Sequence, residues 1–425
     1  MPQTFTEGAL APLIVSDFRR MIGADFLWWG TRFMELIILG WLVLDLTDSP
    51  GQVALIGFFR SIPFLLGGFI SGPVIDRWGR RRVILAAQTT DLLVYIAISL
   101  LIWWGLLALW QLAIGAMIVG VAWSLDWPAR RALMPDLVGK TKIVDALLIE
   151  TFTQNVSRIV GPFVAGLLLD AYGALGGFVA LALFSLASLL ILLGLDHQPI
   201  ARDPNPDKPS PVTTMIEGLR YVREKPAILG SLFMTATMNF LVFPYMLMLP
   251  VFARDILNQG PVGLGILGAA PGAGAFAAII LINYLRNHIS NGWIFVAGSA
   301  SQALVILAFT LSTNFYLSLV FLFLSGIGHT SFSIMQSSIV LIASSDEMRG
   351  QAMGTLVLAI GLGPIGQLQM GATADALGAP WAVRISSSLA LLAICIIALV
   401  LPDVYKHHES PPDGSMTAYA GSSSR

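Results

Sequence analysis

Charged side chains within otherwise apolar stretches are the residues of this sequence that could do chemistry. Arg32 and Glu35 lie three positions apart, and therefore on one face of a helix. A guanidinium beside a carboxylate could bind an anion, or let a proton and an anion compete for the same place. The alternative is a permanent structural ion pair, because charge in an apolar environment needs a partner or a function. For Arg60 and Asp91, in two further stretches, we expect such a structural pair.

Three further polar residues have both a functional and a structural interpretation. Arg158 could bind an anionic group of a substrate, or it could pair with Glu150, two helical turns earlier. Asn239 and His329 lie at the middle of later apolar stretches, where they could bind substrate or protons or could only fill space. We take Arg32, Glu35, Arg158, Asn239 and His329 as the candidate substrate and proton site.

The apolar stretches are long enough to cross a membrane. Of the 425 residues, 56% are hydrophobic and 12% charged, against roughly 45–50% and 25% in soluble domains. The hydrophobic residues come in runs of about 20, the length with which a helix crosses a bilayer. We predict an all-α integral membrane protein with twelve transmembrane helices in two six-helix, pseudo-symmetric halves. The spans lie near residues 20–45, 52–75, 83–104, 108–127, 146–170, 174–195, 228–252, 262–285, 292–312, 315–342, 351–374 and 381–401.

Basic residues indicate how these spans are oriented. In this topology they gather on the side that holds both termini, as with Arg19, Arg82 and Arg131, whereas the opposite loops hold essentially Arg254 alone. Lysine and arginine favour the cytoplasmic side of a membrane. We therefore predict a multi-pass protein of the plasma membrane, which in a bacterium is the inner membrane, with both termini in the cytoplasm.

One long polar stretch divides the chain. Its first part is rich in proline, and its second part places Met215, Leu219 and Val222 on one face of an amphipathic helix at the cytoplasmic surface. A short repeat, in which Asp170 and Asp375 occupy equivalent positions, supports two similar halves. We predict an N-terminal bundle over 1–195, a cytoplasmic linker over 196–227, a C-terminal bundle over 228–402 and a disordered cytoplasmic tail over 403–425.

A charged turn between the second and third spans carries a specific pattern. It reads Gly-Pro-Val-Ile-Asp-Arg-Trp-Gly-Arg-Arg-Arg over residues 72–82. This resembles the signature loop of the major facilitator superfamily, Gly-x-x-x-Asp-Arg-x-Gly-Arg-Arg. The alternative is an ordinary basic hairpin between two membrane helices. The matching residues are Gly72, Asp76, Arg77, Gly79, Arg80 and Arg81.

The resemblance implies that this turn belongs to a gate. In that family an acid near the end of the fourth helix bonds the second arginine of the loop, which here means Asp126 and Arg80. Such a bond would lock the two halves together when the transporter faces outward. Glu347 and Arg349, in the corresponding corner of the other half, would join the latch. The alternative for Asp126 is a solvated acid at the membrane interface.

The fifth span contains a second recognisable stretch over residues 157–166. It resembles the fifth-helix motif of the exporting branch of the superfamily, with Gly161, Pro162 and Gly166 in place and Ser157 and Ala165 in the positions of glycines. Small residues permit close helix crossings, so Gly161 and Pro162 are candidate gating residues. An ordinary kinked helix is the alternative. Residues 41–50, 60–64 and 129–138 further resemble the branch that contains the enterobactin exporter and the macrolide efflux pumps.

Several other classes of function lack support in the sequence. There is no phosphate-binding Gly-x-x-x-x-Gly-Lys loop and no nucleophile with a convincing base. A net charge of −1 without a basic stripe gives no reason to expect nucleic acid, and Cys395 is the single cysteine. We expect no enzyme activity, no cofactor and no metal.

The function implied by the resemblance is secondary active transport, most simply export of a small organic molecule such as a drug, an anionic metabolite or a siderophore. We expect rocker-switch alternating access and proton antiport, with substrate and proton competing at Arg32 and Glu35. The alternatives are a proton-coupled symporter or facilitator that takes up an organic anion, a lysophospholipid transporter, and a transport-dead sensor or scaffold. We expect a monomer in the lipid bilayer.

Overall fold

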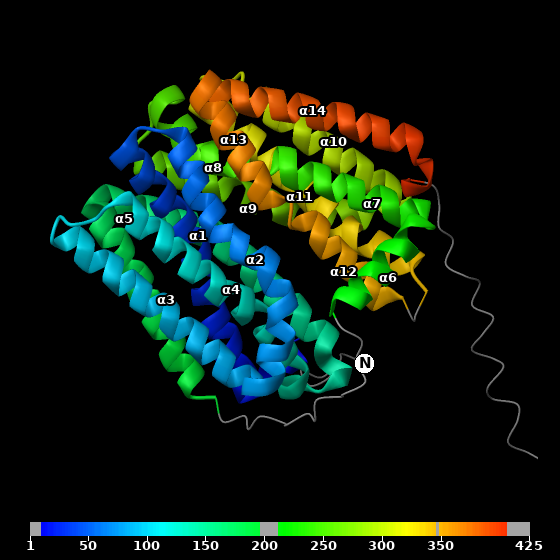
Figure 1. The fold of residues 1–425 in the computed structure, drawn as a ribbon, viewed down its shortest axis with the longest axis horizontal. Helices are drawn as coiled ribbons and strands as arrows, with labels where there is room; N and C mark the ends of the chain where they lie inside the picture. The colour runs from blue at the N-terminus through cyan, green and yellow to red at the C-terminus, as the bar shows by residue number, and fades with distance from the viewer. Residues whose placement is uncertain (1–9, 196–210, 346–347, 406–425) are drawn as a thin grey trace, which may run out of the picture.

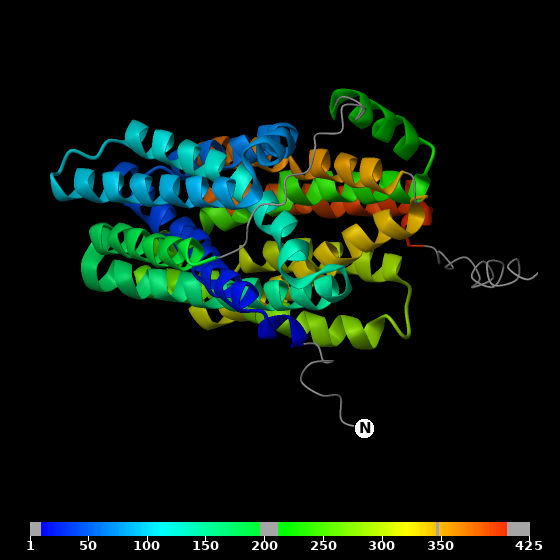
Figure 2. The same ribbon diagram turned by 90° about the horizontal axis from the view of Figure 1, so that it is seen from below.

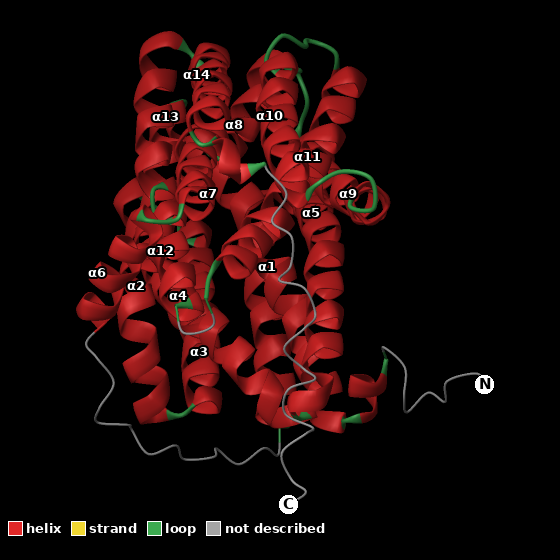
Figure 3. Cartoon of the chain, turned by 90° about the vertical axis from the view of Figure 1, so that its right-hand side faces the viewer, coloured by secondary structure: helices red, strands yellow, loops and turns green. Residues whose placement is uncertain are grey.

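The computed structural model describes residues 10–195, 211–345 and 348–405, and in these ranges it contains helices and connecting turns but no strand (Figure 3). The predicted proline-rich part of the linker and nearly all of the predicted tail lie outside the described residues. The first helices along the chain are α1 (Ser16–Thr47), α2 (Pro50–Trp78), α3 (Arg80–Trp103), α4 (Leu109–Val138) and α5 (Ile143–Leu193). After them come α6 (Pro211–Arg223), α7 (Pro226–Thr237), α8 (Tyr245–Val251), α9 (Pro261–Leu285), α10 (Asn291–Phe309), α11 (Phe315–Ala343), α12 (Arg349–Ile360), α13 (Gly363–Leu377) and α14 (Ala379–Val400).

Helix α5 holds two antiparallel legs. Its chain leaves the helical conformation at Gly173, where φ is 64° and ψ is −166°, a region that glycine enters without steric penalty. Ser157 Oγ, before this point, donates to the carbonyl oxygen of Phe26, and Ser188 Oγ, after it, donates to that of Ala24. Both legs therefore pass the same level of α1, which confirms the predicted reversal between residues 170 and 174.

Each predicted span coincides with helix in the structure, and one boundary differs substantially. In the described ranges, ten segments are long and apolar enough to cross a membrane, with α5 as one of them and α2 not among them. The ten segments become twelve when α2 is added and the two legs of α5 are counted separately. The number of twelve spans stays a prediction. The predicted end of the fourth span at residue 127 is wrong, since α4 continues to Val138. Asp126 and Arg130, on either side of the predicted end, are buried in an ion pair.

The helices form two bundles that lie side by side (Figure 1). We call α1–α5 the N-terminal bundle and α7–α14 the C-terminal bundle. In Figure 1 the N-terminal bundle occupies the lower left and the C-terminal bundle the upper right, and in Figure 2 the long helices of both run roughly parallel. The bundles meet where α5 packs on α9 and where α2 packs on α13. The predicted domain boundaries stay a prediction.

Helix α6 confirms the helix that the sequence predicts in the second part of the linker. It packs against α12, where Gln351 Nε2 donates to Glu217 Oε2 at 3.1 Å. Val222 is buried, whereas Leu219 is 46% exposed. The predicted apolar face is thus shared between the C-terminal bundle and the surroundings.

Candidate functional site

A first cluster of buried charges joins α1, α2 and α3, and we call it the Arg32 cluster. Arg32 Nη2 donates to Asp91 Oδ2 at 2.5 Å, and Arg32 Nη1 lies 3.8 Å from Glu35 Oε2. Arg60 Nε donates to the same oxygen of Glu35 at 3.0 Å. Arg32, Glu35 and Asp91 are each 3% exposed or less. Two arginines face two carboxylates, so the cluster has no net charge.

A second cluster joins α1, α3 and α4, and we call it the Arg130 cluster. Arg130 binds Asp126 through two nitrogens, at 2.7 and 3.2 Å, and donates to Asp25 at 2.5 Å. It also donates to Gln88 Oε1 at 3.1 Å. Asp25, Asp126 and Arg130 are at most 2% exposed. One arginine therefore faces two carboxylates, and the cluster carries one negative charge more than positive when both acids are ionised.

The indole ring of Trp28 links the two clusters. The guanidinium carbon of Arg32 lies 5.5 Å from the ring centroid and that of Arg130 lies 4.7 Å from it. Such contacts between a cation and an aromatic ring are attractive, more so when they are removed from water. Helix α1 is thus fastened to α2, α3 and α4 through a continuous polar core inside the N-terminal bundle.

These contacts correct the expected pairing of Arg60 with Asp91. The two side chains reach α1 from different helices, and each binds a residue of α1 instead of the other. Arg32 and Glu35 are predicted as a substrate and proton site, with a structural ion pair as the alternative. Burial and the ion pairs with Asp91 and Arg60 favour the structural alternative, although Nε and Nη1 of Arg32 have no hydrogen-bond partner. A role in transport stays a prediction.

Arg158 does not pair with Glu150. Glu150 Oε2 lies 3.5 Å from Arg131 Nη2 on α4, so the structural alternative for Arg158 is wrong. Instead, Arg158 Nη2 lies 3.2 Å from Nε2 of His329 on α11. Because a guanidinium only donates, the imidazole nitrogen accepts in this contact. The pair thus joins the N-terminal bundle to the C-terminal bundle.

Aromatic rings surround this pair from both bundles. The guanidinium carbon of Arg158 lies 5.8 Å from the ring centroid of Phe33, and the imidazole of His329 packs edge-on against Phe243, with centroids 4.9 Å apart. Both polar side chains are partly exposed, although Nε of Arg158 is itself buried without a hydrogen-bond partner. Among the described residues, no carboxylate lies within ion-pair distance of Arg158.

Asn239 lies on a π-helical turn, Met238–Val242, that follows α7. Its side-chain nitrogen donates to the carbonyl oxygen of Thr235 at 2.9 Å, and Gln336 on α11 donates to the hydroxyl of Thr235 at 2.9 Å. The asparagine is 9% exposed. It belongs to an uncharged polar group of the C-terminal bundle, and its predicted contact with substrate stays a prediction.

The signature turn has one partner that the sequence does not suggest. Arg80 contacts Asp136 in the last turns of α4. The expected bond between Arg80 and Asp126 is wrong for this structure, because Asp126 is fully buried and bound to Arg130 at a deeper level of the same helix. The alternative of a solvated Asp126 is wrong for the same reason.

The other residues of the turn are exposed or fix the backbone. Gly72, Asp76 and Arg77 are exposed at the end of α2. Gly79 has φ of 83°, which favours glycine and reverses the chain between α2 and α3. Glu347 lies outside the described residues, so its predicted part in a latch stays a prediction.

Gly161 and Pro162 lie where α5 packs most closely on its neighbours. A Cβ built on Gly161 would lie 2.9 Å from the carbonyl oxygen of Gly30 on α1, and one built on Gly268 of α9 would lie 3.1 Å from Cβ of Pro162. One turn further, a Cβ on Gly166 would meet the carbonyl oxygen of Pro261 at 2.6 Å. These residues are required for close packing, and their predicted gating role is untested.

Two polar contacts between the bundles lie at the turn that joins α1 to α2. Asp375, near the end of α13, accepts from the backbone nitrogen of Gly51 at 2.8 Å and from Ser49 Oγ at 3.1 Å. Arg254 contacts Asp48, the residue that ends α1. An anion at a helix N-terminus and a cation at a helix C-terminus are both favourable. The C-terminal bundle thus holds both helix ends of this turn.

The sequence repeat contained a signal for this contact. The equivalent residue, Asp170, lies 3.8 Å from the place of a Cβ on Gly260, which begins α9. Each repeat therefore brings a carboxylate to the start of a helix in the other bundle. The sequence reveals the repeat, but the partner of each aspartate depends on how the bundles pack.

Contacts between the bundles continue from this turn to about the middle of the helices. Along α2 they run from Gly51, beside Gly371 of α13, to Leu65, beside Gly361 at the end of α12. Along α5 and α9 they extend to Phe152 and Phe276, whose ring centroids are 5.6 Å apart. At the opposite end, the ribbons of α2 and α4 lie apart from those of α12 and α6 (Figure 1).

Comparison with known proteins supports a transporter. Residues 7–416 match the family described as transmembrane secretion effector, MFS_3. The chain is 22% identical to the staphyloferrin A transporter of Staphylococcus aureus, with 88% of this chain and 92% of that protein covered. It is 26% identical to the enterobactin exporter EntS of Escherichia coli, with 90% and 92% covered.

Solved structures show the same fold at low sequence identity. The nucleoside transporter NupG superimposes with a TM-score of 0.72 at 15% identity, over 92% of this chain and all of that chain. A bacterial homologue of the human lysosomal transporter Spinster gives a TM-score of 0.71 at 13% identity, over 93% and 99%.

The chain belongs to the transmembrane secretion effector family of the major facilitator superfamily, as its signature turn indicates. It is a multi-pass membrane protein and a transporter of small organic molecules, not an enzyme. Within the described ranges, no group of three or more His, Cys, Asp or Glu side chains is arranged to hold a metal.

Proposed function

We propose that this transporter exports a small organic anion from the cytoplasm by alternating access, in exchange for protons. In this proposal it works as a monomer in the plasma membrane, with both termini in the cytoplasm. The observation that carries the proposal is the contact between Arg158 and His329, which joins the two bundles at mid-depth. The relatives named for staphyloferrin A and enterobactin support a similar class of cargo.

Arg158 supports an anionic substrate because it has no carboxylate partner among the described residues. A cation within a membrane protein is unfavourable unless an opposite charge compensates it. The hydrogen-bond partner of Arg158, His329, belongs to the other bundle, and Nε of Arg158 is left without a hydrogen-bond partner. An anionic group that bound there would supply the missing charge and contact both bundles, while Phe33 and Phe243 provide apolar surface.

The Arg130 cluster is the better candidate for the proton. Asp25 and Asp126 share Arg130, so a proton on one of them would leave the buried cluster neutral. Glu35, which the sequence suggested, has Arg60 and Arg32 beside it and no excess of negative charge. Trp28, which contacts Arg130, packs against Trp29, and Trp29 stacks on Phe33. These aromatic contacts offer a route by which protonation could influence the substrate site.

The proposed movement is a tilt of the two predicted domains, 1–195 and 228–402, about their contact. The contacts of Asp375 and Arg254 with the α1–α2 turn would close the outer side in the present arrangement. Opening that side requires these contacts to break while the cytoplasmic ends approach. The signature turn, with Arg77 and Asp76 exposed, would then meet the C-terminal bundle.

Transport into inverted membrane vesicles tests this proposal. The probes are staphyloferrin A, enterobactin, and an anionic and a cationic dye of similar size. We expect a pH gradient, acidic inside the inverted vesicles, to drive uptake of an anionic probe, and Arg158→Gln to abolish it. Arg384→Gln is the matched control, because Arg384 lies within the C-terminal bundle and donates to the carbonyl oxygen of Thr310. Uptake of the cationic dye alone, or equal loss in both variants, would contradict the proposal.

A further inference from the structure

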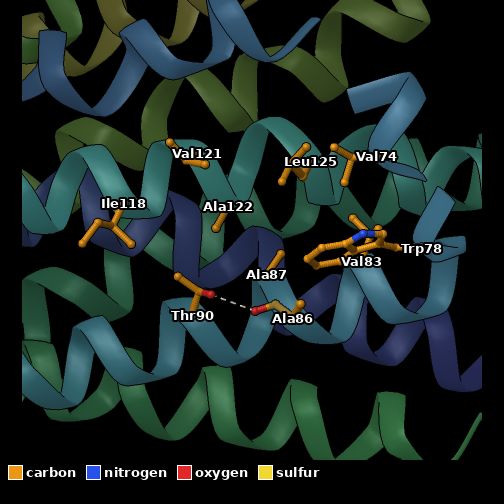
Figure 4. Close-up of a pocket in the computed structure, with 10 residues that line it drawn as sticks. All are labelled: Val74, Trp78, Val83, Ala86, Ala87, Thr90, Ile118, Val121, Ala122 and Leu125. Atoms are coloured by element: carbon orange, nitrogen blue, oxygen red, sulfur yellow. Dashed lines mark hydrogen bonds between the residues drawn. The ribbon is translucent and has the colours of Figure 1, made fainter. Parts of the chain in front are cut away.

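An apolar cavity lies beside the signature turn, on the outside of the N-terminal bundle. It has a volume of about 320 Å³ and lies between α2, α3 and α4 (Figure 4). Trp78 and Val74 contribute from α2, Thr90 from α3 and Leu125 from α4. The hydroxyl of Thr90 donates to the carbonyl oxygen of Ala86 at 2.9 Å, as Figure 4 shows, so its proton is not available to a guest. The cavity suits a hydrocarbon.

The cavity opens to the outside of the bundle and not to its core. Of its lining residues, Trp78 is 55% exposed, Val121 is 48% exposed and Ile118 is 40% exposed. Along α3 it extends from Val83 to Thr90, which corresponds to roughly 10 Å of helix. That extent corresponds to much of one leaflet of the hydrocarbon core, about half of a roughly 30 Å thickness.

Two arginines of the signature turn stand at the end of this cavity. Arg77 follows Val74 by three residues on α2, and Arg82 precedes Ala86 by four on α3, so each shares a helix face with a lining residue. Both arginines are exposed. The remaining two arginines of the turn are engaged within the bundle, where Arg80 contacts Asp136 and Arg81 donates to the carbonyl oxygen of Leu193.

We propose that this cavity binds one acyl chain of an anionic phospholipid, with the phosphate of its head group on Arg77 and Arg82. The charge is complementary, since basic residues at a membrane surface attract anionic lipid. Asp76 in the same turn is also exposed and opposes this attraction, but the two arginines outnumber it. The cavity lies apart from the contact between Arg158 and His329, on the outer surface of a single bundle, although Arg77 also belongs to the turn that would meet the C-terminal bundle in the proposed movement.

A second cavity on the same helices provides an internal control. It has a volume of about 380 Å³ and lies between α2 and α4 near their opposite ends, where Phe59, Leu109 and Trp110 are among its lining residues. It too is lined by apolar residues, and no arginine lines it. It should accept acyl chains without regard to the charge of the head group.

Trp78 lines the first cavity and Trp110 lines the second, so their fluorescence allows lipid binding in the two cavities to be compared. Bromine atoms on acyl chains quench tryptophan fluorescence at close range, so the full chain is placed in bilayer nanodiscs with brominated phosphatidylglycerol or brominated phosphatidylcholine. The difference between the wild type and Trp78→Phe isolates the signal of the first cavity, and the difference between the wild type and Trp110→Phe isolates that of the second. The Arg77→Gln, Arg82→Gln double variant tests the head-group site.

We expect quenching of Trp78 to saturate at a mole fraction of phosphatidylglycerol at least roughly tenfold lower than for phosphatidylcholine. Trp110 should respond equally to both lipids. The double variant should retain its circular dichroism and melting temperature, and should lose the preference at Trp78 alone. Equal quenching of Trp78 by both lipids in the wild type, or a preference that survives in the double variant, would overturn the proposal.

Discussion

The two bundles differ in the kind of polar residue that they bury. In the described ranges, the N-terminal bundle buries the charged residues Asp25, Arg32, Glu35, Asp91, Asp126, Arg130 and Glu150. The buried polar residues of the C-terminal bundle are serine, threonine, asparagine and glutamine, such as Thr235 and Gln336. Burial of a charge is unfavourable unless it is paired and hydrogen-bonded. The charges of the N-terminal bundle accordingly form clusters, whereas neutral groups suffice in the C-terminal bundle.

This difference suggests different roles for the two bundles in the proposed transport. The Arg130 cluster has two carboxylates for one arginine, so in the proposed mechanism the N-terminal bundle is the part that takes up the proton. The C-terminal bundle contributes His329 at the boundary and the outer contacts through Asp375 and Arg254. In the proposed mechanism it is the surface against which the charged bundle tilts.

The largest expected effect comes from breaking the Arg130 cluster. Arg130→Met leaves Asp25 and Asp126 buried without a cation, and removal of one partner of a buried ion pair costs about 3–5 kcal/mol. Gln336→Leu in the C-terminal bundle removes a neutral hydrogen bond to Thr235 and should cost about 1 kcal/mol. Thermal unfolding of the purified protein in detergent measures both. A similar loss of stability in the two variants would remove the distinction between the bundles.

A smaller effect is expected from neutralising a single acid of that cluster. Asp126→Asn leaves Arg130 with one carboxylate, and we expect the protein to fold while the acceleration of transport by a pH gradient falls roughly tenfold. Glu35→Gln is the matched variant in the Arg32 cluster. It leaves two arginines with one carboxylate, so we expect it to lower the melting temperature and not the response to the pH gradient. If Glu35→Gln abolished the response to the pH gradient and Asp126→Asn did not, the transported proton would bind at Glu35 and not at the Arg130 cluster.

The smallest effect concerns the contact between the bundles at the α1–α2 turn. Asp375→Asn weakens the interaction with the start of α2, which is worth about 1 kcal/mol, and should raise exposure of this end roughly fivefold. With Cys395→Ser as background, labelling of an Ala54→Cys variant by a membrane-impermeant maleimide measures this exposure, since Ala54 is buried beneath Gly371. Asp45→Asn, an exposed acid nearby, is the control. Equal labelling rates in both variants would exclude a closing role for Asp375.

Local properties of the chain were predictable, with one instructive exception. The apolar runs located the helices, because a helix satisfies its own backbone hydrogen bonds and needs only sufficient apolar length. The reversal at Gly173 was likewise marked by a glycine between two such runs. The exception is the end of α4, which lies beyond the predicted end because Asp126 and Arg130 compensate the charge of each other in the interior of the bundle.

The sequence by itself determined that the chain is a membrane protein of the major facilitator kind, and which charged residues lie within its helices. Only the tertiary structure decided the partner of each charge. Spacing along a helix placed Arg32 beside Glu35, but Asp91 from α3 and Arg60 from α2 form the shorter contacts. The physical reason is that ion pairing requires separations of a few ångströms in space, and helix packing alone brings residues of different helices that close.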